Sequence, residues 1–567
     1  MKKPEYKNFD AIIYRKSGKY PYVNEQDKSS CDILKELTGL SASAGSTVVS
    51  EKYHSAVFVD GRYKLAAKLA VDQQKFDILD HNFASIMEWI RQNIPIGMKI
   101  AYDPRFFSIN LFNKIKTDLS KYQLMPINFK DVLGLSLNKR PLKIHRVKRT
   151  FSESKISSIY DTITQNKLDA YLLCDPCSIS WLLNIRDFDA QFSPVVFGYL
   201  LVDKNFDAVL YLDEVYSEVI NPSECVIKIK HEKDLIADLQ KFSVIGIDET
   251  ETAAHLYQIY QNNFRYVSNP CLLQKAIKNE TEIADMKAAA KTDSAAIVRL
   301  LHWLYSYKED NTKQNPTEIE IANKLVEFRQ QYDNYVGESF QCISAADEHS
   351  AIIHYSPTPQ NDTRVKNMLL LDTGGQYKYG TTDITRTICL NKPTREQKLF
   401  YTLVLKGHIA LANMKFPEGT TLAQLEPFAR QFLWHNSVDY PHSTSHGIGY
   451  MSSVHESLIS SAHSSRGGGS AVLHPGMIIS NEPGYYKNGF FGIRLENMML
   501  VKDCLDGYLT FETISLVPFD WYLIDEHILT DIEIEWAQKY HKNIYSKINS
   551  FLPEDVIHWL IQYMRIS

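Results

Sequence analysis

The chain has 567 residues, of which 44% are apolar and 23% are charged, and its formal net charge is -5. This composition is typical of a soluble globular protein, and the length predicts about two to four domains. A charge this close to neutral gives no indication of a nucleic acid or an anionic membrane as a partner.

No segment is predicted to cross a membrane or to direct secretion. The most apolar run, SPVVFGYLLV (193–202), has about half the length of a transmembrane helix. The N-terminus has two lysines but no apolar core behind them. Eight scattered cysteines favour reduced thiols and a cytoplasmic protein. Cys174 and Cys177 have C-x-x-C spacing, but they lack a second pair or a histidine partner, so we interpret them as part of a turn at a strand end.

The N-terminal half of the chain contains two blocks with a similar pattern. Each block begins with a strand opened by Asp-Ala, continues through a turn-rich region and ends in a strand closed by Asp. The opening strands are FDAIIY (9–14) and LDAYLL (168–173), and the closing strands are SAVFVDGRY (55–63) and AVLYLDE (208–214). This pattern predicts an internal duplication of an α/β unit.

A basic, proline-containing stretch, LNKRPLKIHRVKRT (137–150), separates the two blocks. We interpret it as a solvated linker rather than as an anion-binding site. The predicted domains are therefore an N-terminal α/β domain (1–145), a second α/β domain (146–268) and a third domain (269–567).

The third domain is predicted to begin with a long amphipathic helix over 269–304, because its apolar residues recur at helical spacing. A second helix is expected over 315–332, opened by a proline and a threonine, and a third near 394–413. Short strands with hairpin turns alternate with these helices. The glycine-rich segment 466–470 lacks the Lys-Ser/Thr of a phosphate loop and is interpreted as a surface loop.

Two predicted hairpins each carry a pair of carboxylates. In LDTGGQYKYGTTDITR (371–386), Asp372 and Asp383 are direct cross-strand partners if the turn is centred between Tyr377 and Lys378. In NEPGYYKNGFFGIRLEN (481–497), Glu482 and Glu496 are partners if the turn centres on Gly489. Direct partners share a face about 5 Å apart, where two carboxylates repel unless a positive charge lies between them.

A group of histidines lies between the two hairpins, in YPHSTSHGIGYMSSVHE (440–456), which contains His442, His446 and His455. Four carboxylates and one imidazole form an oxygen-rich site whose charge suits two divalent cations. Two such ions can share and activate one water. Taken singly, each aspartate could be a turn residue and each histidine a hydrogen-bonded polar group, but the repeated spacing favours metal binding.

These motifs resemble the core of the M24 "pita-bread" metallopeptidases, and within them the three-domain aminopeptidases P (Xaa-Pro aminopeptidases). The matching segments are LLLDTGGQYKYGTTDITRTI (369–388), HSTSHGIG (442–449), SNEPGYYKNGFFGIRLEN (480–497), DPCSISWLLNIR (175–186) and the segment 519–548. The resemblance implies an α/β and α+β protein. Two related α/β domains of the creatinase/prolidase N-terminal type would precede a pita-bread catalytic domain, which would carry a C-terminal extension over about residues 515–567.

The resemblance also implies a ligand set for two divalent metal ions. Asp372 would bind one ion, Asp383 and Glu496 would bridge both, and His446 and Glu482 would complete the second. Manganese is the metal that the resemblance favours, with zinc or cobalt as alternatives.

The resemblance further implies catalytic and substrate-binding roles. Glu482 would assist deprotonation of the shared water. His354, His442 and His455 would orient the scissile carbonyl, stabilise the tetrahedral intermediate and help to protonate the leaving nitrogen. Arg494 would bind on the substrate side and support the metal ligands.

The sequence departs from the family pattern beside the ligand histidine. Ser445 replaces the usual glycine immediately before His446, and Ser443 lies in the same motif. A glycine there would permit positive φ or a close backbone approach, both of which serine resists. The two serines are therefore expected to affect activity or substrate preference if the backbone requires either property.

The function implied is hydrolysis of the bond between an N-terminal residue and a following proline, with peptides that carry proline at position two as partners. A homodimer is implied by the family alone, and neither a nucleic acid nor a membrane is expected as a partner. A prolidase-like dipeptidase on the same fold is the alternative enzyme. The alternative of another class is a catalytically inactive binding protein, although such proteins lose metal ligands that this chain keeps.

Overall fold

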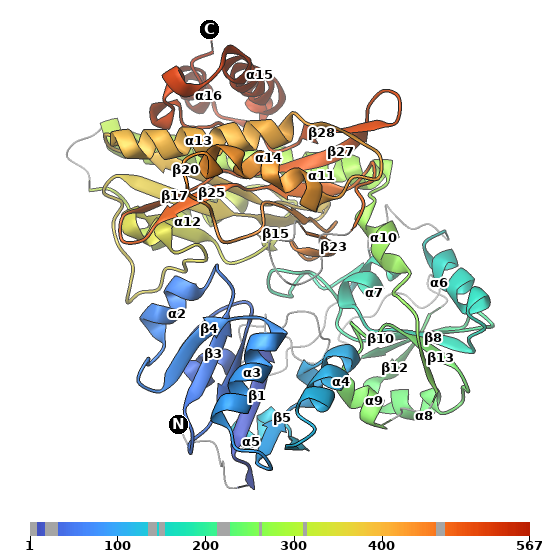
Figure 1. Cartoon of the computed structure of the whole chain (residues 1–567). Helices are drawn as coiled ribbons and strands as arrows, with labels where there is room; N and C mark the ends of the chain where they lie inside the picture. The colour runs from blue at the N-terminus through green and yellow to red at the C-terminus, as the bar shows by residue number, and fades with distance from the viewer. Residues whose placement is uncertain are drawn as a thin grey trace. The chain divides into compact units, whose positions relative to one another are not determined.

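The computed structural model describes residues 8–16, 32–133, 144–146, 154–212, 227–259, 263–309, 314–460 and 471–566. The chain divides into two compact units, Met1–Gln274 and Lys275–Ser567 (Figure 1). Most of the predicted linker 137–150 and the glycine-rich segment 466–470 lie outside the described residues. The boundaries of the three predicted domains stay a prediction.

The first unit begins with a mixed six-stranded sheet in the order β4-β3-β2-β1-β5-β6. Strands β2 and β3 are buried along their whole length and β1 over its first four residues, as expected for strands covered on both faces. The strands are β1 (Ala11–Lys16), β2 (Gly45–Val49), β3 (Ser55–Val59), β4 (Phe76–Asp80), β5 (Lys99–Tyr102) and β6 (Gln123–Pro126). The helices are α1 (Ile33–Thr38), α2 (Lys64–Ala70), α3 (Phe83–Asn93), α4 (Ile109–Asp118) and α5 (Phe129–Leu133).

A second six-stranded sheet in the same unit has the order β12-β11-β10-β8-β13-β14. Its strands are β8 (Ala170–Leu173), β10 (Tyr199–Asp203), β11 (Ala208–Leu212), β12 (Ile227–His231), β13 (Ile245–Ile247) and β14 (Phe264–Tyr266). The helices are α6 (Ser154–Gln165), α7 (Pro176–Leu183), α8 (Leu235–Leu239), α9 (Ala254–Ile259) and α10 (Cys271–Ala276), of which the last extends into the second unit. Cys174 directly follows β8 and Cys177 lies in the first turn of α7, so the pair does occupy a strand-end turn.

The two sheets have the same topology, which confirms the predicted relation between the two blocks. In the first sheet, β2 pairs antiparallel with both of its neighbours, β1 and β3, and the other three pairings are parallel. In the second sheet, β10 pairs antiparallel with both of its neighbours, β8 and β11, and the other three pairings are parallel. The repeated aspartate has the same role in both. Asp10 accepts from the backbone N–H of Lys99, and Asp169 accepts from that of Val244, at the start of the adjacent parallel strand. Each aspartate also pairs with a lysine, Lys52 or Lys204, at 2.6 and 2.9 Å.

The second unit contains the predicted long helices, with one difference at the first. The helix expected over 269–304 is interrupted after α10 and resumes as α11 (Glu280–Glu309). Asn279 begins α11 because its side chain accepts from the N–H of Glu282, whose carboxylate accepts from the N–H of Asn279 in return. The other predicted helices are found as α12 (Glu318–Arg329) and α13 (Arg395–Ala412), each opened by a threonine capping box.

The remaining elements of the second unit form the sheets that carry the candidate site. A six-stranded sheet has the order β21-β28-β27-β24-β22-β23, and two three-stranded sheets have the orders β15-β18-β19 and β16-β17-β20. The strands are β15 (Tyr335–Glu338), β16 (Ile343–Ala346), β17 (Met368–Thr373), β18 (Gly375–Tyr377), β19 (Gly380–Thr381), β20 (Ile384–Cys389), β21 (Lys415–Pro417), β22 (His446–Gly447), β23 (Glu456–Ser460), β24 (Ile478–Asn481), β27 (Asn497–Asp503) and β28 (Tyr508–Thr513). Helices α13 and α14 (Leu422–Trp434) lie side by side along one side of the unit, and α15 (Asp531–Ile548) and α16 (Glu554–Tyr563) lie at its end (Figure 1). Within the described ranges, every helix is too short or too polar to span a bilayer.

Candidate metal centre

The hairpin that carries the two aspartates has a different register from the predicted one. Strand β17 (Met368–Thr373) pairs with β20 (Ile384–Cys389) so that Asp372 lies opposite Thr385, not opposite Asp383. The reason is the turn. Beyond these strands, β18 (Gly375–Tyr377) pairs with β19 (Gly380–Thr381), and Tyr377 lies opposite Gly380. The turn is therefore centred one residue later than predicted.

A buried ion pair from the helices anchors the chain beside both aspartates. Asp293 of α11 accepts from Arg329 Nε of α12 at 2.7 Å, and both side chains are almost fully buried. Arg329 also donates to the hydroxyl of Thr373, which follows the first aspartate, at 2.8 Å. Asp293 accepts from the hydroxyl of Thr382, which precedes the second aspartate, at 2.7 Å. The same ion pair therefore fixes the backbone next to both predicted ligands.

The hairpin that carries the two glutamates has the predicted register. Strands β25 (Gly484–Lys487) and β26 (Phe491–Arg494) pair around Gly489, which has a φ of 74°. Below them, β24 (Ile478–Asn481) pairs with β27 (Asn497–Asp503), with Asn481 opposite Asn497. Glu482 and Glu496 lie between these two ladders, so the register on either side confirms that they face one another.

His446 joins the carboxylates from a third strand, β22 (His446–Gly447), which is adjacent to β24. Its Nδ1 lies 3.0 Å from the carbonyl oxygen of Gly447, to which it can only donate, so Nε2 is the ring nitrogen that faces the carboxylates. Nε2 lies 3.4 Å from Asp383 Oδ2 and 3.5 Å from Glu482 Oε1. This is the orientation that a metal-ligating imidazole adopts.

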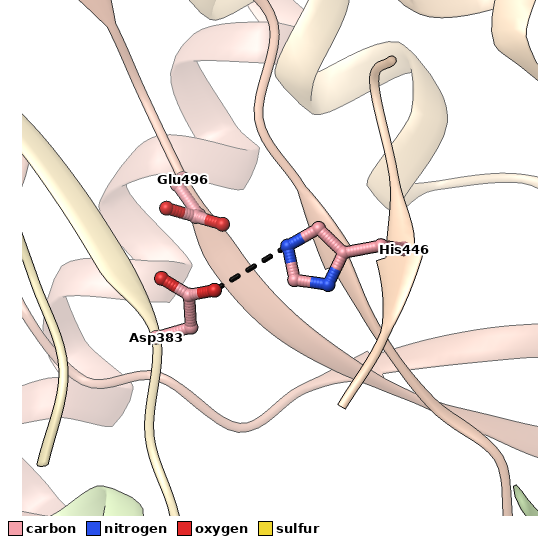
Figure 2. A group of neighbouring side chains, drawn as sticks. All are labelled: Asp383, His446 and Glu496. Carbon is pink, nitrogen blue, oxygen red and sulfur yellow. Dashed lines mark ion pairs between the residues drawn. The ribbon is translucent and has the colours of Figure 1, made fainter. Parts of the chain in front are cut away.

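Asp383, His446 and Glu496 point toward one another (Figure 2). Each offers one ligand atom, and these atoms all lie within 4.8 Å of one another. Three buried donors converge here from β22, from the residue before β20 and from the residue before β27, which is the spacing of a metal site.

The electrostatics of the site fit divalent cations. Burial, followed by repulsion from neighbouring carboxylates, raises the pKa of Asp383 and of Glu496 well above their usual values. The same two causes raise the pKa of Glu482 to about 8. Asp372 Oδ1 is buried and has no hydrogen-bond partner among the residues described. Buried carboxylates that lie close together are stable in their charged form only if positive charge is nearby. Bound cations would supply that charge, and they would also give the Asp372 oxygen a partner.

A chain of hydrogen bonds leads from Asp372 to His442. Arg494 Nη2 donates to Asp372 Oδ2 at 2.6 Å, and Arg494 Nη1 donates to the hydroxyl of Tyr486 at 2.7 Å. That hydroxyl lies 2.8 Å from His442 Nε2. Sequence reasoning missed Tyr486, although the period of two along β25 places it on the same face as Glu482.

The other two predicted histidines lie around this centre. His455 is exposed, and its ring centroid lies 4.3 Å from that of His446 in an edge-to-face arrangement. His354 is half-buried, and the carbonyl of its neighbour Ile353 accepts from Arg494 Nη2 at 3.3 Å. The structure therefore brings His455 against His446 and positions the backbone beside His354 next to Arg494.

The backbone at the two unusual serines does not adopt the positive φ that would favour glycine. Ser443 and Ser445 are both described, and neither has a positive φ. Ser445 is fully buried, and the N–H of the following His446 donates to Ser480 Oγ at 2.9 Å. Because the backbone of the motif is of a kind that any residue adopts, the expected conformational penalty for serine is absent.

Comparison with known proteins identifies the family and the fold of the chain. Residues 284–503 match metallopeptidase family M24, residues 136–282 match the creatinase/prolidase N-terminal domain, and residues 507–565 match the C-terminal region of peptidase M24. Aminopeptidase P2 of Arabidopsis thaliana is 32% identical over 91% of this chain and 80% of its own. The chain belongs to metallopeptidase family M24. The predicted family and fold class are thereby confirmed.

Further relatives and solved structures extend this comparison. A probable Xaa-Pro aminopeptidase P of Botryotinia fuckeliana is 33% identical over 94% of this chain and 87% of its own. The X-prolyl aminopeptidase of Caenorhabditis elegans, described as a cytosolic enzyme with a di-nuclear active site, has a TM-score of 0.89 at 27% identity, and covers 99% of this chain and 96% of its own. The Xaa-Pro dipeptidase of Bacillus anthracis shares the fold over 65% of this chain and 98% of its own, with a TM-score of 0.53 at 23% identity.

Proposed function

We propose that this M24 metallopeptidase is a dimetal aminopeptidase that hydrolyses the bond between an N-terminal residue and a following proline. The observation that carries the proposal is the convergence of Asp383, His446 and Glu496 in a buried group of metal-site dimensions. Support comes from relatives named Aminopeptidase P2 and probable Xaa-Pro aminopeptidase P, matched over 80% and 87% of their length, and from the structural neighbour described as having a di-nuclear active site.

The ligand assignment follows from the donors present. Asp372 would hold one ion, Asp383 and Glu496 would be shared, and His446 and Glu482 would complete the second. The buried carboxylates and the Nε2 atom of His446, which faces them, fit such ions. Manganese is the metal we propose, with zinc or cobalt as alternatives. When bound, two divalent cations would polarise the scissile carbonyl and lower the pKa of a shared water.

The residues around the ions would transfer protons and orient the scissile carbonyl. Glu482 would accept the proton that the attacking water loses. The prolyl nitrogen of a tertiary amide has no N–H and is a poor leaving group until it is protonated. His354, His442 and His455 would orient the carbonyl and supply that proton. Arg494, held between Asp372 and Tyr486, would fix His442 through the tyrosine hydroxyl and bind on the substrate side.

The proposed substrates are peptides with proline at position two. We also propose a cytoplasmic protein that forms a homodimer. The cytoplasmic assignment is supported by the Caenorhabditis elegans neighbour, which is described as cytosolic, and the homodimer by the family resemblance alone.

The test is metal-dependent cleavage of defined peptides. Purified full-length protein is incubated with Xaa-Pro-Xaa and Xaa-Ala-Xaa tripeptides and an Xaa-Pro dipeptide, with Mn²⁺ or with chelator, and products are followed by mass spectrometry. We expect release of the first residue from the proline tripeptide with Mn²⁺ only. His446→Ala should abolish release, whereas His558→Ala, at an exposed position in α16, should not.

The same experiment separates the alternatives. Cleavage of the dipeptide alone would replace the aminopeptidase by a prolidase-like dipeptidase on this fold. Folded protein that releases nothing with Mn²⁺, Zn²⁺ or Co²⁺ would favour a catalytically inactive binding protein.

A further inference from the structure

Arg386 is a buried cation close to the centre of the site. It lies on β20, the strand that Asp383 immediately precedes, and is only 2% exposed. Its guanidinium stacks over the ring of Phe519, with its central carbon 4.5 Å from the ring centroid. In the part of the chain that the structure describes, no carboxylate forms an ion pair with Arg386. A buried charge without a counter-charge is retained only if its N–H groups are fully used.

One set of acceptors for Arg386 belongs to the strands that carry the predicted ligands. Nη1 donates to the carbonyl oxygens of Thr385 and Glu496 at 2.8 and 2.6 Å. Nη2 donates to the side-chain oxygen of Asn497 at 2.8 Å. One side chain therefore holds the backbone of the predicted bridging glutamate, the backbone of Thr385 and the side chain of Asn497.

The other set belongs to the C-terminal region of the family, residues 507–565. Nε donates to the carbonyl oxygen of Pro518 at 3.0 Å, and Nη2 donates to that of Val517 at 2.6 Å. Nη2 also donates to the hydroxyl of Tyr540 on α15 at 3.0 Å. The rigid fork of Arg386 therefore connects the C-terminal region directly to the residues around Glu496.

The carboxylate of Glu496 is fixed in the same place. Thr385 donates its hydroxyl to Glu496 Oε2 at 2.8 Å, and the N–H of Glu496 donates to the carbonyl oxygen of Thr385 at 3.0 Å. Thr385 is the neighbour of Arg386 on β20, and Asp383 immediately precedes this strand. The position of Glu496 relative to Asp383 thus depends on β20 and on the support that Arg386 receives from Val517, Pro518 and Tyr540.

We infer that the C-terminal region is a structural part of the metal centre, because through Arg386 it sets the position of Glu496 relative to Asp383 and so the affinity for divalent metal. Arg386 and Tyr540 are positioning residues in this account. The inference rests on the proposed assignment of Asp383 and Glu496 as metal ligands.

The test compares two tyrosines of the C-terminal region. Tyr540→Phe removes the hydroxyl that supports Arg386. Tyr563→Phe removes a hydroxyl in α16, where the ring packs against Tyr305 and Trp559 and takes no part in the contacts of Arg386. Mn²⁺ affinity of the full-length proteins is measured by titration calorimetry, alongside kcat and KM for the proline tripeptide and urea unfolding of the metal-free forms.

We expect Tyr540→Phe to weaken Mn²⁺ binding by about threefold to tenfold, the value of one hydrogen bond, with kcat falling and KM for the peptide unchanged. Tyr563→Phe should stay within about twofold of the wild type on the same scale. Arg386→Lys, which cannot form the fork, should weaken Mn²⁺ binding more than Tyr540→Phe.

Two results would count against the inference, and they differ. If the wild type binds Mn²⁺ and Tyr540→Phe binds it equally well, the C-terminal region has no influence on the site. If the wild type itself binds no divalent metal, the proposed function fails and this inference fails with it. Should Arg386→Lys not fold, the comparison of the two tyrosine variants still decides the question.

Discussion

Replacing Asp293 by asparagine should weaken the hairpin that carries the two aspartates. Asp293 accepts three bonds of 2.7 Å, from Arg329, Tyr377 and Thr382. Removing one charge of a buried ion pair costs about 3–5 kcal/mol, because the remaining charge is left uncompensated. Asparagine keeps the shape and one acceptor oxygen, and Arg329 keeps Thr373 as a partner. We therefore expect a loss at the lower end, about 3 kcal/mol.

The measurement is hydrogen exchange of the backbone amides in β17 and β20, read by mass spectrometry. This method reports the free energy of local opening of these strands, which is needed because the chain has two compact units and is not expected to unfold in one step. Glu512→Gln is the matched control. It pairs with Lys287 of the same helix α11 but is partly exposed, so its loss should stay below about 1 kcal/mol. A loss of less than about 1 kcal/mol for Asp293→Asn would refute the view that this ion pair anchors the hairpin.

Three further predictions concern the site and its surroundings. Asp383→Asn relieves carboxylate repulsion, so the midpoint of thermal unfolding should rise in chelator, and the stabilisation by Mn²⁺, about 2.7 kcal/mol at a hundredfold excess over Kd, should disappear; a lower midpoint in chelator would contradict this. Tyr486→Phe removes the hydroxyl that holds His442 and should lower kcat about tenfold at unchanged KM, so an unchanged kcat in steady-state assays would exclude that role. His541 accepts the N–H of Phe519 at 3.1 Å, and burial lowers its pKa from 6.5 to about 4. The unfolded chain therefore takes up the proton first as pH falls below 6.5. Between pH 7 and pH 5 the wild type should lose about 2 kcal/mol more stability than His541→Gln, measured by urea unfolding; equal pH dependence in both would disprove it.

The two hairpins show which registers the sequence can specify. Gly489 in its Asn-Gly turn fixes the centre of the second hairpin locally, and the pairing of Glu482 with Glu496 follows from counting. The first hairpin has no such local signal. Its turn is set by Tyr377, whose hydroxyl donates to Asp293 on a helix far away in the sequence, and counting from the sequence alone gave a centre one residue too early.

The same distinction applies to the site. Spacing and chemistry predicted the four carboxylates and a nearby histidine as ligands, because ligand residue types recur within short motifs. The choice of His446 among the three histidines came from the family resemblance. Arg386 and Asp293 carry no such pattern. Their importance comes from acceptors such as Val517 and Thr382, which only the tertiary fold brings to them. The role of a buried charged residue can be recognised only when its hydrogen-bond partners are known, and the sequence alone does not show which residues these are.

The shared register of the glutamate hairpin has a consequence for the tolerance of this segment to changes in length. The pairing of β24 with β27 and that of β25 with β26 share one register, with Glu482 and Glu496 between them. Residues added in equal number to both strands near Gly489 would therefore leave all of these pairings unchanged. Phe490 at this tip is 63% exposed, and a Cβ added to Gly489 would meet nothing within 4 Å. The tip is therefore a suitable place to insert a fluorescent reporter, whereas a single residue inserted on one strand would turn one of the two glutamates away from the other.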